Sequence, residues 1–145
     1  PIAGTLGFGR THLHEIVERA RLAGPVAVDA PVQLDSLDMT DTDRARVLDA
    51  CRAAPEGAII VVHGTDTMVE TARVIAGASL PGKCIVLTGA MVPYDLAGSD
   101  ALFNLGFAAA CARLLAPGVW IAMNGRVHAW DRVRKDREKG VFEAP

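Results

Sequence analysis

The sequence contains few of the residues that mark several large classes of protein. Its 145 residues include three cysteines, one tyrosine and two tryptophans, and aromatic residues make up 5% of the chain. Such a low cysteine content excludes a small secreted scaffold held together by disulfides. Cys51, Cys84 and Cys111 stand in apolar contexts without the short spacings of a metal site. We therefore expect reduced core thiols, a cytoplasmic protein, and neither a bound metal nor a cofactor.

Long apolar segments and an excess of charge are also absent. The longest apolar runs, at residues 59–62 and 119–123, are far shorter than the roughly 20 residues that cross a membrane as a helix. No positively charged stretch followed by an apolar core opens the chain, so we expect no signal peptide and no membrane partner. The formal net charge of −2 gives no electrostatic basis for binding nucleic acid.

What the sequence does contain is a regular alternation of strand and helix patterns. Half of its residues are hydrophobic, and its length suits one domain, which we place at residues 1–145. Hydrophobic periodicity predicts strands at residues 26–34, 59–62, 84–87 and 119–123, with Pro31 interrupting the first. It predicts helices at residues 11–23, 68–78 and 99–115, and one that Thr40 and Asp43 cap and that ends before Pro55. This alternation indicates an α/β fold: a three-layer, doubly wound, mostly parallel sheet with right-handed crossovers.

Three loops that follow the predicted strands carry clusters of polar residues, at residues 35–39, 63–67 and 88–93. Ligands of open α/β sheets bind at the carboxyl ends of strands, so these loops are expected to converge on one site. In the second loop, Thr65 and Asp66 place a hydroxyl beside a carboxylate just before a helix. Thr67 and Glu70 form a capping-box pattern, and His63 is expected to be a hydrogen-bonded core residue.

The three loops read Ser-Leu-Asp-Met-Thr-Asp from Ser36, His-Gly-Thr-Asp-Thr-Met from His63, and Gly-Ala-Met-Val-Pro from Gly89. In this order they resemble the loops of the L-asparaginases and related amidohydrolases, whose N-terminal domain has the α/β architecture described above. The match extends from about Gly9 to the C-terminus. Because the larger enzymes carry a second, C-terminal domain that this length does not accommodate, the chain resembles a short, single-domain asparaginase.

The resemblance implies hydrolysis of L-asparagine to L-aspartate and ammonia, with activity on glutamine left open. Carried over to this sequence, Thr65, Asp66 and Lys135 correspond to one catalytic grouping, in which the lysine and carboxylate assist a hydroxyl that is a poor nucleophile alone. Asp66 would also hold the substrate α-amino group. For Lys135 the alternative is a solvated charged surface, since it stands in the charged stretch from residue 132 to 139.

Further residues are implied in substrate binding. Ser36, the backbone of Asp35 and Gly64 would hold the substrate, with the α-carboxylate at the first two. Backbone amides around Ala90 would help to stabilise the oxyanion. Leu37 stands where the larger asparaginases usually have a glutamine, so that contact to the carboxylate would be lost or replaced.

The family's other catalytic grouping is a nucleophilic threonine on an N-terminal Thr-Gly-Gly-Thr-Ile loop, assisted by a tyrosine from a lid. The nearest equivalent here is Thr5, in the sequence Ala-Gly-Thr-Leu, and the single tyrosine is Tyr94 in another loop. Thr5 is either the nucleophile or part of a lid remnant or coil, with the true nucleophile segment missing from this sequence. Two hypotheses follow: an amidohydrolase that forms a homo-oligomer, or a non-catalytic amino-acid-binding or scaffold domain of the same fold.

Overall fold

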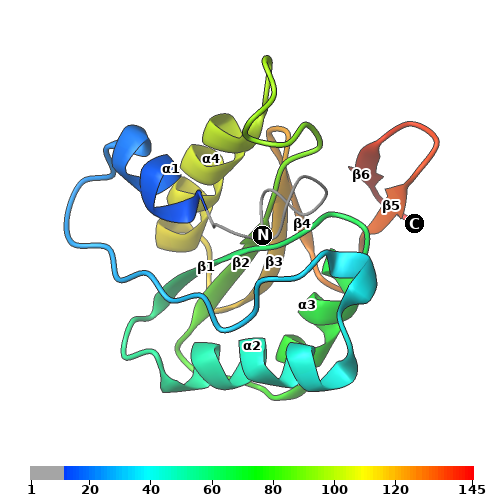
Figure 1. Ribbon diagram of the computed structural model, residues 1–145. Coiled ribbons are helices and arrows are strands. Elements are labelled where there is room, and N and C mark those ends of the chain that lie inside the picture. Colours follow the sequence, from blue (N-terminus) through cyan, green and yellow to red (C-terminus); the bar gives the residue numbers. More distant parts are fainter. Residues whose placement is uncertain (1–11) are drawn as a thin grey trace.

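A computed structural model describes residues 12–145, which form a four-stranded sheet between two layers of helices (Figure 1). The strand order is β1-β2-β3-β4. Strands β1 (Ala58–Val62), β2 (Cys84–Thr88) and β3 (Gly118–Met123) are parallel, and β4 (Arg126–Ala129) pairs antiparallel with β3. A separate hairpin is formed by β5 (Arg134–Asp136) and β6 (Val141–Glu143). The predicted α/β class, with a mostly parallel sheet, is confirmed.

The helices cover the two faces of the sheet. Helices α2 (Asp41–Ala53) and α3 (Met68–Gly77) lie on one face, and α1 (Leu13–Ala20) and α4 (Ala101–Leu114) lie on the other (Figure 1). The alternation of β2 explains this arrangement, because successive side chains of a strand point to opposite faces. Ile85 and Leu87 pack with α3, whereas Cys84 and Val86 pack with α4. All five residues of β2 are buried, so the strand supplies a core to both layers.

Local sequence sets the start of α2 as predicted. The Thr40 side chain accepts a hydrogen bond from the Asp43 amide at 3.3 Å, and the Asp43 carboxylate accepts from the Thr40 amide at 3.0 Å. These bonds satisfy amides that the first turn of a helix leaves unpaired. The helix ends before Pro55, and its Val47 and Cys51 enter the core shared with α3.

The crossovers differ from the prediction that all of them are right-handed. Strands β1, β2 and β3 are adjacent, parallel and in sequence order. Helix α3 connects the first pair and α4 the second, yet these helices pack on opposite faces. Two crossovers that step in the same direction over opposite faces must have opposite hands. One connection is therefore left-handed, an exception to a rule that holds in about 98% of cases.

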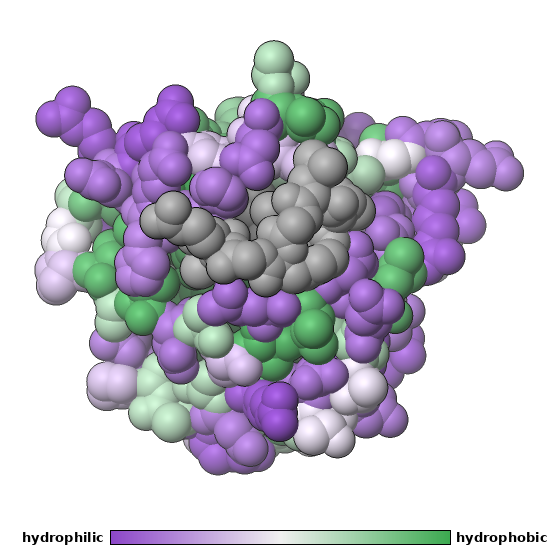
Figure 2. Space-filling model, in the orientation of Figure 1, coloured by the Kyte–Doolittle hydropathy of each residue, from purple (hydrophilic) through white to green (hydrophobic). Residues whose placement is uncertain are grey.

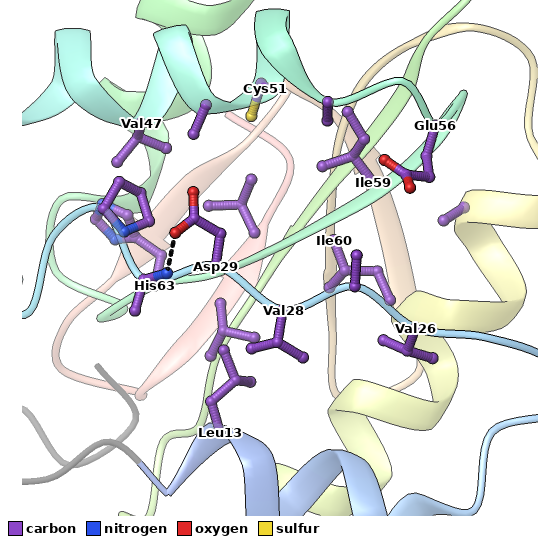
Figure 3. A pocket seen from close by; sticks show the side chains of 18 of the residues that line it. Leu13, Val26, Val28, Asp29, Val47, Cys51, Glu56, Ile59, Ile60 and His63 are labelled. Atoms are coloured by element: carbon purple, nitrogen blue, oxygen red, sulfur yellow. Dashed lines mark hydrogen bonds between the residues drawn. The ribbon is translucent and has the colours of Figure 1, made fainter.

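The strand predicted at residues 26–34 does not form. This segment is not helical and pairs with no strand of residues 12–145, and a cavity of about 930 Å³ lies between it and β1 (Figure 3). The cavity is lined by Val26 and Val28 from the segment, Ile59 and Ile60 from β1, and Val47 from α2. Within residues 12–145, no strand pairs with the outer edge of β1. An apolar extended segment without a hydrogen-bonded neighbour cannot join a sheet. The strand predicted from hydrophobic periodicity at residues 26–34 is therefore wrong.

The periodicity also left features undetected. On α4, Phe103 is 60% exposed, whereas Leu105 and Ala109 are buried. Strands β4, β5 and β6 were not expected, and β4 follows a turn in which Asn124 and Gly125 both have positive φ. Among the described residues, no helix is both long enough and apolar enough to cross a membrane.

Candidate functional site

Thr65, Asp66 and Lys135 meet at the carboxyl end of β1. The strand ends at Val62 and α3 begins at Met68, so Thr65 and Asp66 occupy the connecting loop. Lys135 Nζ donates a hydrogen bond to Thr65 Oγ1 at 2.8 Å and another to Asp66 Oδ1 at 2.7 Å. The Lys135 side chain is 12% exposed, and Thr65 is buried. A cation, a carboxylate and a hydroxyl therefore share one partly buried cluster.

The hairpin that carries Lys135 is anchored in the core. Val133 and Phe142 are buried and belong to the cluster that also contains Met68 and Ile75 of α3. Lys135 lies opposite Phe142 in the β5–β6 pair. The neighbouring charged side chains form the hydrophilic protrusion at the upper right of Figure 2. Most of the charged stretch is thus a solvated surface, whereas the Lys135 side chain is largely buried and turns toward the Thr65 loop.

Arg137 is a member of this cluster that the sequence did not reveal. Its Nη2 donates to the Asp66 carbonyl at 3.5 Å, and its Nε lies 3.9 Å from Asp66 Oδ1. The Arg137 side chain is 65% exposed, so solvent screens this weak contact. Asp66 consequently faces two cations from the same hairpin. No signal in the sequence indicated this contact, because Arg137 begins the turn that follows β5 and no hairpin was predicted.

The first loop packs tightly against the second. A Cβ on Gly64 would lie 2.7 Å from Ser36 Oγ, so only glycine permits this approach. Ser36 is buried, and its carbonyl accepts a 2.6 Å hydrogen bond from the Thr67 hydroxyl. The prediction that Thr67 caps α3 is therefore wrong, because its side chain makes no cap hydrogen bond and instead joins the two loops. Asp35 does cap a turn, as its Oδ1 accepts from the Leu37 amide at 2.9 Å.

The third loop adjoins the second and the hairpin. The Thr88 carbonyl accepts a 2.8 Å hydrogen bond from the His63 amide, and a Cβ on Gly89 would lie 2.2 Å from the His63 carbonyl oxygen. On the hairpin side, the Met91 side chain lies close to Gly140. Ala90, the residue expected to offer its amide, lies between these contacts and is partly buried. The three predicted loops do converge at one edge of the sheet.

His63 is the buried, hydrogen-bonded residue that the sequence indicated. Its Nδ1 lies 2.6 Å from the Gly64 carbonyl, and its Nε2 lies 2.8 Å from Thr71 Oγ1. Because a carbonyl only accepts, Nδ1 carries the proton and Nε2 accepts from the Thr71 hydroxyl. Burial lowers the pKa of His63 to about 4, although the Gly64 carbonyl opposes the shift. The ring is therefore neutral at physiological pH and supports the loop rather than supplying a charge.

A polar network behind the third loop was also missed. Asp100, Asn104 and Asn124 are hydrogen-bonded to one another and to this loop. Burial alone would raise the pKa of Asp100, but hydrogen bonds from Val92, Asn124 and Met91 hold it below the ordinary value. A usable signal was the pair of polar residues four apart, Asp100 and Asn104, at the start of an otherwise apolar helix.

The structure thus brings together Thr65, Asp66 and Lys135, and beside them Ser36 and Gly64. Ala90 borders the same edge, and Leu37 is 62% exposed. Thr5 lies outside the described residues. The three cysteines are buried and free, and no group of three or more histidine, cysteine or acidic side chains in residues 12–145 is placed to hold a metal ion.

Comparisons with known proteins agree with this arrangement. A family model described as "Asparaginase, N-terminal" matches residues 5–142. An L-asparaginase of Thermococcus kodakarensis is 34% identical over 84 residues, which cover 57% of this chain and 26% of that protein. A probable periplasmic L-asparaginase of Haemophilus influenzae is 34% identical over 122 residues, covering 79% of this chain and 35% of that protein.

Among solved structures, a probable cytoplasmic L-asparaginase from Campylobacter jejuni superposes with a TM-score of 0.82 at 25% identity. The superposition covers 92% of this chain and 44% of that one. The chain therefore spans less than half the length of these relatives. The residues that the family model matches include the three loops and Lys135. We conclude that the chain belongs to the asparaginase family and has the fold of that family's N-terminal domain.

Proposed function

We propose that this domain hydrolyses the side-chain amide of L-asparagine, giving L-aspartate and ammonia. The observation that carries the proposal is the pair of hydrogen bonds from Lys135 Nζ to Thr65 Oγ1 and Asp66 Oδ1, at 2.8 and 2.7 Å. Membership of the asparaginase family supports amidohydrolase chemistry in general. The specific substrate and the roles of the residues are our inference.

The geometry suits Thr65 to proton transfer. Its oxygen accepts a hydrogen bond from Lys135, which leaves the hydroxyl proton available to a second acceptor in the cleft. When the amide C–N bond breaks, the departing nitrogen needs a proton, and Thr65 is placed to supply it. Lys135 can then return a proton to Thr65, while Asp66 holds the lysine in position. Proton transfer by positioned side chains of this kind contributes about 10²- to 10⁴-fold to a rate.

Substrate binding is assigned to the converging loops. In addition to pairing with Lys135, Asp66 holds the α-amino group of the substrate. It can do so because its side chain is 36% exposed. Ser36 and the backbone of Asp35 receive the α-carboxylate at the close contact with Gly64. The amide of Ala90 is directed at the oxyanion of the tetrahedral intermediate. A glutamine side chain is one methylene longer, and discrimination on that basis is typically modest, about 10- to 200-fold.

The attacking group is assigned to a threonine outside residues 12–145, either Thr5 or one on a preceding strand. The outer edge of β1 provides the place for such a strand. It has no partner among the described residues, and the cavity beside it reaches His63 and Gly64 at the site. A strand inserted parallel to β1 would end next to Thr65. From β-sheet spacings of about 3.3, 4.8 and 10 Å, six residues of buried strand occupy roughly 950 Å³, which is close to the cavity volume of about 930 Å³.

The same cavity favours a second candidate function, an amino-acid-binding or scaffold domain without turnover. No serine, threonine or tyrosine of the described residues lines it. If no segment supplies the nucleophile, the cluster around Lys135 would still bind the amino and carboxylate groups of L-aspartate. The two candidates differ in a single outcome, because binding of L-aspartate without release of ammonia from L-asparagine supports the second.

The test is ammonia release from L-asparagine by the chain and by matched lysine variants. Lys135→Met keeps the length of the side chain and removes its cation, and we expect a loss of at least about 100-fold in kcat. Lys139→Met is the control, because Lys139 lies in the same hairpin but its side chain is 65% exposed and its ammonium pairs with Asp136 and Glu143 rather than with Thr65 or Asp66. Equal activity of the two variants would refute the role of Lys135.

We further propose that the domain assembles as a homo-oligomer and is cytoplasmic. Helix α4 exposes Phe103 and Leu114, at 60% and 83%, and large exposed apolar side chains on one helix are typical of an interface. Three buried free thiols suit a reducing compartment. Sedimentation velocity of Phe103→Ser beside the unmodified chain tests the assembly, and dissociation of the variant alone is the expected result.

A further inference from the structure

We propose that Asp100 is a positioning residue that aims the Ala90 amide into the site. It holds the backbone after Ala90 directly, at Met91 and Val92, and the backbone before it, at Gly89, through Asn104. This inference rests on the proposed function, in which that amide stabilises the oxyanion. It concerns a side chain that neither contacts the cluster around Lys135 nor belongs to the three loops. The argument comes from the hydrogen bonds of one carboxylate and of the helix that it begins.

The Asp100 carboxylate accepts hydrogen bonds from two consecutive amides of the loop. The Val92 amide donates to Oδ1 at 3.0 Å, and the Met91 amide donates to Oδ2 at 3.2 Å. Asp100 stands at the N-terminus of α4, and its own side chain makes no cap bond to that helix. Its acceptors therefore serve the loop rather than the usual helix amides. Hydrogen bonds to a charged acceptor are stronger than those between neutral groups.

Two asparagines extend this hold to the other side of Ala90. Asn104 is fully buried, and its Nδ2 donates to the Gly89 carbonyl at 2.9 Å and to Asp100 Oδ2 at 2.8 Å. Asn124 donates from Nδ2 to Asp100 Oδ2 at 2.9 Å, and its amide donates to Asn104 Oδ1 at 2.9 Å. The backbone at Gly89, Met91 and Val92 is thus tied to one network anchored on α4 and on the turn after β3.

Ala90 lies between the backbone groups that this network holds but does not take part in it. Within residues 12–145, neither its amide nor its carbonyl makes a hydrogen bond, although the backbone is held directly before and after it. Backbone groups in a partly buried loop normally find partners, so a pinned but unpaired peptide is a place for a ligand atom. Hydrogen-bond donors that are fixed in advance stabilise a developing charge without reorganising. The role of the network is therefore to fix the Ala90 amide before the reaction begins.

The network predicts a specific effect of Asp100→Asn. Three donors converge on Oδ2 and one on Oδ1, so an amide that keeps its oxygen toward the three must turn its NH₂ toward the Val92 amide. Donor then faces donor, and the loop is released at Val92. We expect the NMR order parameter of the Ala90 amide to fall from about 0.85 to below about 0.6. Asp49→Asn is the control, since Asp49 is an exposed acid on α2 that pairs with Arg52 of the same helix.

The functional readout separates positioning from general stability. With L-asparagine, we expect Asp100→Asn to lower kcat by about 10- to 100-fold with KM changed less than threefold, since the loss of one oxyanion donor costs about 10²- to 10³-fold. An Ala90 order parameter equal to that of the control would overturn the inference, whatever the activity. If the unmodified chain releases no ammonia, the proposed function fails. The Ala90 measurement still decides whether Asp100 positions the loop.

Discussion

The contact between Gly64 and Ser36 gives the sharpest prediction about how the site is built. In Gly64→Ala, the new Cβ would lie 2.7 Å from Ser36 Oγ and 2.8 Å from Ser36 Cβ. Carbon atoms in favourable contact are about 3.5 to 4.0 Å apart, so the two loops must separate by close to 1 Å. That movement also stretches the 2.6 Å hydrogen bond from the Thr67 hydroxyl to the Ser36 carbonyl.

The expected cost follows from these two effects. Overpacking a well-packed region costs about 1 to 3 kcal/mol, and loss of one hydrogen bond costs about 1 kcal/mol. We therefore expect Gly64→Ala to lower the free energy of unfolding by about 2 to 4 kcal/mol. In urea denaturation, where small proteins have m values of about 1 to 3 kcal/mol/M, the midpoint should fall by roughly 1 to 2 M.

A double variant isolates the cause. Ser36→Gly removes both Oγ and Cβ, so that the nearest remaining atom to the new methyl is the Ser36 amide nitrogen at 3.3 Å. In that background Gly64→Ala should cost at least about 1 kcal/mol less. Gly77→Ala is the control, because nothing lies within 4 Å of its added Cβ and alanine favours a helix. An equal cost of Gly64→Ala in both backgrounds would refute the packing of these loops.

Two further predictions concern the same region. The pKa of His63 is about 4 in the folded chain against an ordinary 6.5, so the unfolded chain binds the proton first as pH falls. Stability contributed by the neutral His63 ring is complete above pH 6.5 and decreases by about 3 kcal/mol toward pH 4. Urea denaturation across this range should show a slope that His63→Gln reduces, and His128, whose pKa burial also lowers, contributes to the slope that remains. Thr67→Val should lower the free energy of unfolding in urea by about 1 kcal/mol, because it removes the hydroxyl that bonds the Ser36 carbonyl. Thr67→Ser keeps that hydroxyl and should lose less. An equal loss in both variants would show that the methyl group matters instead.

The sequence identifies the three parallel strands β1, β2 and β3 and the loops that follow β1 and β2. The run from Ile59 to Val62 has a periodicity and composition that permit few structures, and the three loop motifs predict which residues meet. Lys135 was singled out only through the resemblance to a family, because the charged stretch around it is typical of a solvated surface. The core contacts of Val133 and Phe142, which orient that stretch as a hairpin, join residues far apart in the chain.

Features that depend on neighbours in space could not be predicted. Residues 26–34 have the composition of a strand, but a strand also requires a hydrogen-bonding partner, and the described residues provide none beside them. Thr67 fits a capping pattern, yet its hydroxyl donates a hydrogen bond to the nearby Ser36 carbonyl instead of capping the helix. The hand of a crossover is likewise set by the face of the sheet on which the connecting helix packs. Helices α3 and α4 pack on opposite faces, so their crossovers have opposite hands.

The most direct test of the central claim is the release of labelled ammonium from L-asparagine carrying ¹⁵N in its side-chain amide. We predict that the chain releases the label and that Thr65→Val and Lys135→Met each slow the release by about 100-fold or more. Because the two residues act as one unit, the double variant should be no slower than the slower single variant. Release that is unchanged in Lys135→Met, or losses that multiply in the double variant, would contradict a shared proton-transfer site.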